Sequence, residues 1–198
     1  LHDGRVQDPA KQRAYLQTMV NETQRLTRLV NNVLDFSRLE RGQGRNHAQS
    51  IDLGHAVCEI VHAQEDRLRV DGLKLTVATP DKPLHASVDR DALEQILLNL
   101  LDNAVKYVAS GERADVVLTR EACGWCLRVS DYGPGIPPSE RKQVFAAFHR
   151  SDDRLTSERP GCGLGLSIAM RLAEEMGGTL TLEENQPSGC SFILKCHA

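Results

Sequence analysis

The chain has 198 residues, of which 26% are charged and 40% hydrophobic, and its formal net charge is −3 at pH 7. This composition is typical of a folded globular protein and excludes a disordered or a membrane-spanning chain. The negative net charge argues against nucleic acid as the main partner. No apolar run approaches the roughly 20 residues that a membrane helix requires.

The length allows one ordinary domain and a smaller segment. Because the chain opens with Leu1 rather than methionine, we expect a fragment of a longer protein. The six cysteines are scattered without a disulfide framework. Cys123 and Cys126 match C-x-x-C, but they flank a predicted turn and no second pair accompanies them. We therefore expect reduced cysteines and a cytoplasmic protein.

Residues 9–41 are predicted to form one long helix. Asp8 followed by Pro9 is a typical start, an N-cap with proline at the first helical position. Residues at alternating spacings of three and four form the seam of a coiled coil: Leu16, Met19, Thr23, Leu26, Val30, Val33 and Ser37. Such a stripe needs partner helices. The polar segment 41–50, which contains two glycines, indicates a linker.

The rest of the chain alternates predicted helices and strands. Asp52 and Asp89 are each placed to cap the helix that follows. Helices are expected over 51–68, 89–109 and 165–176, and strands over 73–78, 114–120, 125–131, 179–184 and 191–196. The expected fold class is α+β: a two-layer α/β sandwich with a mixed, mostly antiparallel sheet and helices on one face, preceded by the long helix.

The helix over 93–108 carries two stripes. Its core face comprises Leu93, Ile96, Leu97, Leu100, Leu101, Ala104 and Val108. A second stripe on the far side comprises Gln95, Asn99, Asn103 and Lys106. A polar stripe is ordinarily just solvated, but asparagine is a mediocre helix former. Two carboxamides one turn apart, followed by a lysine, suit Mg²⁺ and phosphate, and we favour that function.

The segment SDYGPGIPP, residues 130–138, follows directly after a predicted strand. Its composition is typical of an ordinary turn. It also suits a flat base, because Asp131 can accept a hydrogen bond from an exocyclic amine while Gly133 and Gly135 leave room against the backbone. The carboxylate would select adenine, which offers an amine donor where guanine offers a carbonyl oxygen.

An aromatic pair, a polar loop and a glycine-rich stretch follow. Phe145 and Phe148 are expected in the core, and the polar segment 151–160 is typical of a lid. GCGLGLSIAM, residues 161–170, leads into a helix whose N–H groups would face an anion. Leu166 breaks the dinucleotide pattern and no lysine follows for a P-loop, so this stretch alone indicates phosphate and no particular nucleotide.

Taken in order, these motifs resemble the catalytic, ATP-binding end of bacterial sensor histidine kinases, members of the GHKL ATPase superfamily. NLLDNAVKY resembles the N box of that family, DYGPGIP the G1 box, FAAFHR the F box and GCGLGL the G2 box. LVNNVLDFSRLE, at the end of the long helix, resembles the second helix of the dimerisation and phosphotransfer domain. The resemblance covers nearly the whole chain.

The resemblance implies ATP bound across one face of the sandwich together with Mg²⁺. Asp131 would hold the adenine amino group, Asn103 would bind Mg²⁺, and Asn99, Lys106 and Arg150 would have catalytic roles near the phosphates. The implied ATP-binding residues are Asn99, Asn103, Lys106, Tyr107, Asp131, Gly133, Gly135, Ile136, Phe148, Gly161, Gly163, Leu164, Gly165 and Leu166. Hydrolytic relatives carry a glutamate base at the position of Asn99, so phosphoryl transfer is expected to be preferred over hydrolysis.

The resemblance also implies domains and partners. Residues 1–44 would belong to the dimerisation and phosphotransfer domain, and residues 45–198 would form the catalytic domain. The full-length protein would form a homodimer through helix 9–41 and relay its phosphoryl group to a response-regulator receiver domain. Nucleic acid is not an expected partner. A membrane anchor, in the inner membrane if the full-length protein has one, would lie upstream.

Two departures from the family pattern stand out. The phosphoacceptor motif, a histidine followed by an acidic residue and usually Arg-Pro, does not occur, and His2 falls where the first bundle helix would already be ending. We expect the acceptor upstream, so this chain should bind ATP without autophosphorylating. Cys190 stands where relatives often have Thr or Ser supporting the adenine aspartate, and a thiol is a weaker hydrogen-bond partner. Somewhat weaker adenine binding is expected.

Two other functions remain as alternatives. A degenerate, ATP-sensing dimerisation module would bind nucleotide without transferring phosphoryl, and the intact N, G1 and G2 motifs argue against it. A serine kinase of the anti-sigma type would lack the bundle helix, and helix 9–41 argues against it.

Overall fold

The computed structural model describes residues 8–41, 47–70, 72–107, 113–149 and 163–197. Its elements are α1 (Pro9–Glu40), β1 (Gln49–Asp52), α2 (Leu53–Val70), β2 (Lys74–Ala78), β3 (His85–Val88), α3 (Arg90–Tyr107), β4 (Arg113–Glu121), β5 (Gly124–Asp131), α4 (Gly165–Glu175), β6 (Gly178–Glu184) and β7 (Cys190–His197). Each predicted helix and strand is confirmed, with small differences at the ends. Strands β1 and β3, which pair antiparallel as a separate two-stranded sheet, were not predicted from the sequence. Four residues each are too few to show a periodicity.

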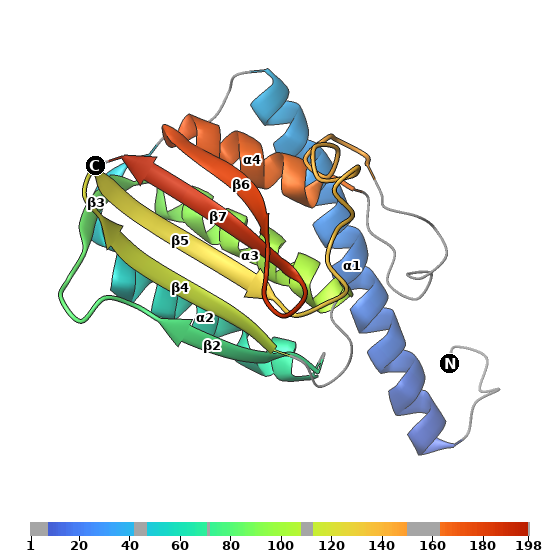
Figure 1. The fold of residues 1–198 in the computed structure, drawn as a ribbon. Coiled ribbons are helices and arrows are strands. Elements are labelled where there is room, and N and C mark those ends of the chain that lie inside the picture. Colours follow the sequence, from blue (N-terminus) through green and yellow to red (C-terminus); the bar gives the residue numbers. More distant parts are fainter. Residues whose placement is uncertain (1–7, 42–46, 71, 108–112, 150–162, 198) are drawn as a thin grey trace.

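Five strands form the main sheet in the order β2-β4-β5-β7-β6. Strand β2 runs parallel to β4, and every other neighbouring pair is antiparallel. Helices α2, α3 and α4 cover one face of this sheet (Figure 1). The predicted fold class, a mixed and mostly antiparallel two-layer α+β sandwich, is confirmed.

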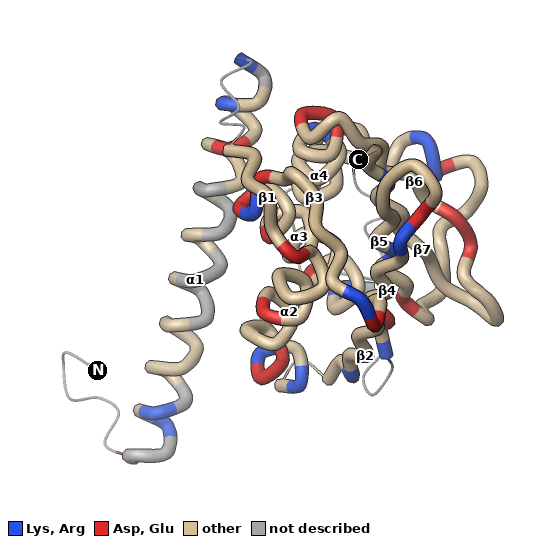
Figure 2. The backbone as a smooth tube through the Cα atoms, turned by 90° about the vertical axis from the view of Figure 1, so that its left-hand side faces the viewer, with Lys and Arg blue, Asp and Glu red and all other residues tan. Residues whose placement is uncertain are grey.

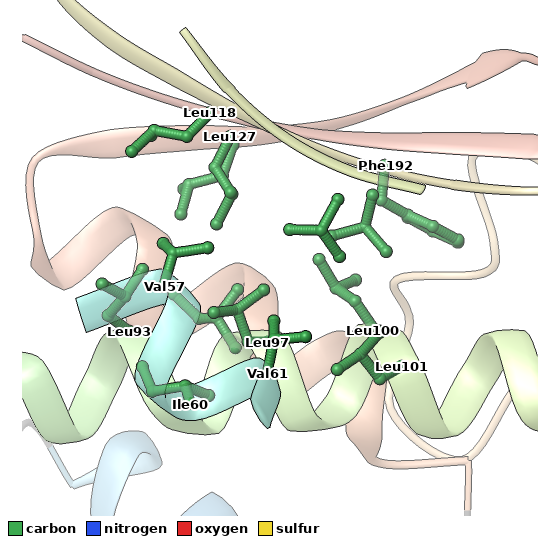
Figure 3. Packing of buried hydrophobic residues seen from close by; sticks show 14 of the residues in the cluster. Val57, Ile60, Val61, Leu93, Leu97, Leu100, Leu101, Leu118, Leu127 and Phe192 are labelled. Atoms are coloured by element: carbon green, nitrogen blue, oxygen red, sulfur yellow. The ribbon is translucent and has the colours of Figure 1, made fainter. Parts of the chain in front are cut away.

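The hydrophobic core lies between the sheet and the helices (Figure 3). The predicted core face of α3 is buried at Leu93, Ile96, Leu97, Leu100, Leu101 and Ala104, while Val108 lies outside the described residues. Alternate residues of β4, namely Ala114, Val116 and Leu118, are buried against these helices, because successive side chains of a strand point to opposite faces. Leu127 of β5 and Phe192 of β7 join them from the neighbouring strands (Figure 3).

Aspartates begin two of the helices. Asp89 Oδ1 accepts hydrogen bonds from the N–H groups of Asp91 at 3.0 Å and Ala92 at 3.1 Å, and Oδ2 accepts one from His47 N–H at 2.8 Å. Burial would raise the pKa of Asp89, but these backbone donors outweigh it and hold the pKa below its ordinary value. Asp52 Oδ1 likewise accepts an N–H from the first turn of α2 at 3.0 Å. The N-caps predicted at Asp52 and Asp89 are confirmed, and the one predicted at Asp8 stays a prediction.

The two phenylalanines that precede the polar segment, Phe145 and Phe148, lie in different environments. Phe145 is half-buried, and its ring packs edge to face on Phe192, with centroids 6.3 Å apart. The prediction that Phe148 lies in the core is wrong, because its residue is 65% exposed. Its backbone has a φ of 63°, a conformation that L residues other than glycine seldom adopt. Its ring packs against Phe36 of α1 instead.

Helix α1 lies on the helix side of the sandwich, opposite the sheet (Figure 2). The stripe expected to need partner helices is exposed, since Leu16, Met19, Leu26, Val30 and Val33 have exposed fractions between 52% and 59%. Helix α1 also contacts α4. Among the described helices, none combines the length and the apolar character required to span a bilayer.

Candidate functional site

Three polar features of the sequence lie together at one end of the sandwich. The C-terminal part of α3, which carries most of the polar stripe, the loop after β5 and the start of α4 all lie at the end of the sandwich that faces α1 (Figure 1). Helices α3 and α4 pack directly on each other. Asp131 is the last residue of β5 and therefore lies at this end of the sheet.

Asp131 is 5% exposed and is held by backbone groups from two loops. Its Oδ1 accepts hydrogen bonds from the N–H of Gly133 at 3.0 Å and of Cys190 at 3.1 Å. Its carbonyl oxygen accepts a hydrogen bond from Asn185 Nδ2 at 2.7 Å. A Cβ on Gly189, whose φ is +102°, would lie 2.1 Å from that carbonyl oxygen. Only glycine permits this approach to the carbonyl. The two N–H donors fix the direction of the carboxylate.

The loop between β6 and β7 is part of the site, and from the sequence only Cys190, the residue that follows the loop, was expected near Asp131. The loop supplies Asn185 and Gly189 to Asp131, and the N–H of Cys190, the first residue of β7, completes the contacts. For Asn185 and Gly189 the only signal in the sequence is the turn composition of residues 187–189, which predicts a hairpin turn and does not indicate what the turn packs against.

At position 190 the support for Asp131 comes from the main chain. The hydrogen bond is donated by the Cys190 N–H, which any residue except proline would provide. Burial, and next the charge of Asp131, raise the pKa of the Cys190 thiol to about 11. The thiol is thus neutral at pH 7. The expected weakening of adenine binding by this cysteine stays a prediction.

The polar stripe of α3 divides into two parts. Gln95 faces α1, where its Nε2 donates a hydrogen bond to Asp35 Oδ2 at 3.0 Å, so this residue does not belong with the other three. Asn99 lies against the start of α4, where a Cβ on Gly165 would come within 3.1 Å of Asn99 Oδ1. The Asn99 Nδ2 atom is buried and has no hydrogen-bond partner within the described part of the chain. Such an atom is suited to an acceptor supplied by a ligand.

The start of α4 offers backbone N–H groups. Its N-cap residue, Leu164, provides no side-chain hydrogen bond, and the first turn contains no acidic residue. Ser167, in that first turn, donates its hydroxyl to the carbonyl of Leu164 at 2.8 Å, so it does not cap the N–H groups either. The first N–H groups of a helix need an acceptor from outside it, and an anion is a suitable one.

The residues that flank the segment 150–162 lie next to each other. Phe148 N–H donates a hydrogen bond to the Gly163 carbonyl at 3.0 Å. Gly163 has a φ of +71°, and a Cβ there would lie 2.7 Å from the His149 carbonyl oxygen. The predicted lid, with Arg150 and Gly161, lies outside the described residues, as does the Tyr107 side chain.

The other predicted site residues lie around these groups. Asn103 and Lys106 are half-buried on α3, about one and about two turns after Asn99. Gly133, Gly135 and Ile136 form the turn after Asp131, and Gly135 has a φ of +78°. Leu164 is fully buried and Leu166 partly buried at the start of α4. Phe148 bonds Gly163 through its N–H, but its ring packs on α1.

The described residues contain no group of three or more His, Cys, Asp or Glu side chains placed to hold a metal ion. Mg²⁺ bound to a nucleotide needs few protein ligands, because phosphate oxygens and waters provide most of its coordination. Asn103 offers a neutral carboxamide oxygen one helical turn from Asn99, whose Nδ2 lacks a protein partner among the described residues. The donor chemistry of this stripe fits Mg²⁺ carried by a nucleotide.

Comparison with known families identifies the sandwich. The family model described as "Histidine kinase-, DNA gyrase B-, and HSP90-like ATPase" matches residues 88–198. The model described as "His Kinase A (phospho-acceptor) domain" matches residues 1–42. The chain belongs to the histidine kinase-, DNA gyrase B- and HSP90-like ATPase family, so the predicted family is confirmed and ATP is the nucleotide that such a domain uses.

Curated relatives include signalling kinases. The chain is 32% identical to hybrid signal transduction histidine kinase D of Dictyostelium discoideum, over 91% of this chain and 12% of that protein. It is 30% identical to the sensor protein SrrB of Staphylococcus aureus strain N315, over 98% of this chain and 33% of that protein. The chain therefore spans a third or less of the length of these two relatives.

Solved structures agree with this family. The histidine kinase AdeS of Acinetobacter baumannii is 26% identical, with a TM-score of 0.75 over 98% of this chain and 88% of that one. Full-length ShkA in complex with AMPPNP is 27% identical, with a TM-score of 0.76 over 98% of this chain and 42% of that one. Both similarities extend over α1 as well as the sandwich, since they cover nearly all of this chain.

Proposed function

We propose that this chain is the ATP-binding catalytic part of a sensor histidine kinase. In the full-length protein it would transfer the γ-phosphoryl group of ATP to a histidine that precedes this sequence, for relay to an aspartate of a response regulator. The single observation that carries the proposal is the buried Asp131 carboxylate, fixed by two backbone N–H groups at the end of the sandwich where the α3 stripe meets the start of α4.

Asp131 would accept a hydrogen bond from the amino group of adenine. Adenine has a donor at this position and guanine an acceptor, so the fixed carboxylate would favour ATP over GTP. The turn that contains Gly133 and Gly135 would form the floor under the base, since glycine leaves the backbone accessible.

The phosphates would lie between α3 and α4. The N–H groups at the start of α4 and the Lys106 side chain would bind their negative charge. Asn103 would hold Mg²⁺, which neutralises phosphate charge when it is bound. Asn99 would orient the phosphates through its amide, and because an amide cannot take a proton from water, hydrolysis would be slow. Arg150 would act from the lid side.

Residues 1–44 would belong to the dimerisation and phosphotransfer domain, and residues 45–198 to the catalytic domain. The exposed stripe of α1 supports a homodimer, because apolar side chains spaced as in a coiled coil gain stability by packing against a partner helix. The partner of the phosphorylated full-length protein would be a receiver domain. The acceptor histidine would not be His2, so the chain as given would bind ATP without labelling itself.

Isothermal titration with ATP and Mg²⁺ tests the nucleotide site. We expect Asp131→Asn to weaken binding at least about tenfold, because it removes the charge that would accept the adenine amine. We expect Asn103→Asp to weaken binding as much, because it would place a negative charge beside the phosphates. Asp81→Asn, at an exposed residue between β2 and β3, is the matched control and should bind as the unmodified chain does. Undiminished binding by Asp131→Asn would contradict the proposed site.

Labelling with γ-³²P-ATP tests the transfer. An extended chain that includes the upstream phosphoacceptor helix should acquire an acid-labile, base-stable phosphate. Acid-stable label would indicate a serine kinase instead. Nucleotide binding without label in the extended chain would indicate an ATP-sensing module.

A further inference from the structure

A polar network adjoins Asp131 but includes none of the ATP-binding residues named above. Tyr132 follows Asp131 directly, and its hydroxyl donates a hydrogen bond to Asp115 Oδ2 at 2.6 Å. The same hydroxyl accepts a hydrogen bond from Arg113 Nη2 at 2.8 Å. Asp115 Oδ1 accepts a hydrogen bond from Thr76 Oγ1 at 2.5 Å. The network ties the residue after β5 to strand β4 and, through Asp115, to strand β2.

The network fixes the Tyr132 hydroxyl in both of its hydrogen-bonding roles. The guanidinium carbon of Arg113 lies 4.4 Å from the centre of the Tyr132 ring, so the cation contacts the ring face as well as the hydroxyl. Arg113 Nη2 is 3.6 Å from Asp115 Oδ2. The Tyr132 hydrogen bond, and next the Asp115 charge, raise the pKa of Arg113. The ring cannot rotate without breaking contacts to both neighbours.

The strand register explains why this network acts on Asp131. Asp131 pairs with Ala114, the residue between Arg113 and Asp115 on β4. Tyr132 is therefore held by the two residues that flank the β4 partner of Asp131. Tyr132 and Asp131 share a peptide bond and their Cα atoms are about 3.8 Å apart, so a shift of the Tyr132 main chain would be passed directly to Asp131.

The opposite side of the same segment is held by the loop between β6 and β7. Asn185 Nδ2 donates to the Asp131 carbonyl at 2.7 Å, and Ser188 Oγ donates to the Tyr132 carbonyl at 3.4 Å. The segment that carries the carboxylate is thus held from both sides. The loop fixes its main chain, and the Tyr132 side chain fixes it against strand β4.

We propose that Tyr132, held by Arg113 and Asp115, is a positioning residue that sets the direction of the Asp131 carboxylate and with it the preference of the site for a purine that carries a 6-amino group. This proposal rests on the proposed function in one respect, that Asp131 accepts a hydrogen bond from that amine. Hydrogen bonds weaken steeply when their angle departs from linear. A binding group must therefore be held by neighbours whose own conformations are fixed.

Titration with two nucleotides tests the proposal. ATP carries the 6-amino group, and purine riboside triphosphate has a hydrogen atom in its place. Tyr132→Phe removes the hydroxyl and keeps the ring over Arg113. We expect it to weaken ATP binding about three- to tenfold, the range for loss of the one hydrogen bond between the 6-amino group and Asp131. Binding of purine riboside triphosphate, which lacks that amino group, should not change. Asp115→Asn should cause the same selective loss, and the double variant should lose no more than either single variant.

Two controls separate this proposal from the proposed function. Thr119→Val removes a hydroxyl from the far end of β4, where it donates to the Cys126 carbonyl at 3.4 Å, and should change neither affinity. Asp131→Asn should abolish the preference for ATP over purine riboside triphosphate. If it does and Tyr132→Phe weakens both nucleotides equally or neither, the positioning role is wrong and the proposed function stands. If Asp131→Asn leaves the preference intact, adenine recognition by Asp131 is wrong and the positioning role falls with it.

Discussion

Phe36 of α1 and Phe148 pack edge to face, with ring centroids 6.0 Å apart and planes inclined at 69°. The neighbouring residue in α1, Asp35, accepts a hydrogen bond from Gln95 of α3 at 3.0 Å. Phe148 is also bonded through its N–H to the carbonyl of Gly163. The contact with α1 therefore reaches the point where the chain enters and leaves the predicted lid.

Replacement of Phe36 tests how firmly α1 is held. We expect Phe36→Ala to speed backbone amide exchange in residues 33–40 and 145–149 and to lower the free energy of unfolding by about 1 kcal/mol, the usual value of an aromatic pair. Leu34→Ala is the control, since Leu34 lies in the same helix and is exposed. Equal exchange in both variants would show that the ring pair does not hold α1.

Two glycines with positive φ separate backbone strain from a steric clash at the site. A Cβ at Gly189 would lie 2.1 Å from the Asp131 carbonyl oxygen, whereas a Cβ at Gly177 would meet nothing within 4 Å. Gly177→Ala should cost about 1 kcal/mol of stability and leave ATP binding unchanged. Gly189→Ala should cost more and abolish ATP binding, measured by chemical unfolding and titration. Similar effects of the two substitutions would contradict the close approach at Asp131.

The buried thiol of Cys190 predicts a loss of stability at alkaline pH. Burial and the charge of Asp131 raise its pKa in the folded chain to about 11, against an ordinary value of 9.0. The folded state keeps the thiol protonated while the unfolded state ionises it. The contribution to stability is therefore complete below pH 9 and disappears as the pH rises through 11.

Unfolding experiments between pH 8 and pH 11 measure this contribution. The difference in stability between the unmodified chain and Cys190→Ala should shrink by about 2 kcal/mol over that range. Cys123→Ala is the control, because Cys123 is exposed in the turn between β4 and β5. A pH-independent difference for Cys190→Ala would mean that the thiol is not shielded.

Asp89 predicts the opposite pH dependence. Burial opposes ionisation of this carboxyl, but N–H donors from His47, Ala92 and Asp91 outweigh it, so the pKa is lowered below 3.8. Its contribution to stability is complete above that pH and is lost as the pH falls through the folded-state pKa. Asp89→Ala should cost about 1 to 2 kcal/mol at pH 7, as the loss of a helix N-cap does. The cost should shrink in acid, whereas Asp81→Ala should have little effect at any pH.

The secondary structure and the site chemistry could be predicted from sequence because they depend on local patterns. The stripe of α3, the caps at Asp52 and Asp89, and the two hairpins all follow from spacings within one segment. Motif order then identified the family, because glycines, asparagines and the aspartate occur in one sequence of short segments. Strands β1 and β3 could not be predicted from the sequence, because their pairing, and not their own composition, defines them.

The tertiary structure alone decided which of these residues meet. Asn185 is 54 positions from the aspartate whose carbonyl oxygen it binds, and only the pairing of β7 with β5 and β6 brings the two together. Tyr132 lies in a segment of ordinary turn composition, and only the strand pairing sets it against Arg113 and Asp115. Phe148, expected in the core, turns outward to α1. Local periodicity determines which face of an element is apolar, but the residue that packs on that face comes from distant parts of the chain, so sequence spacing cannot name it.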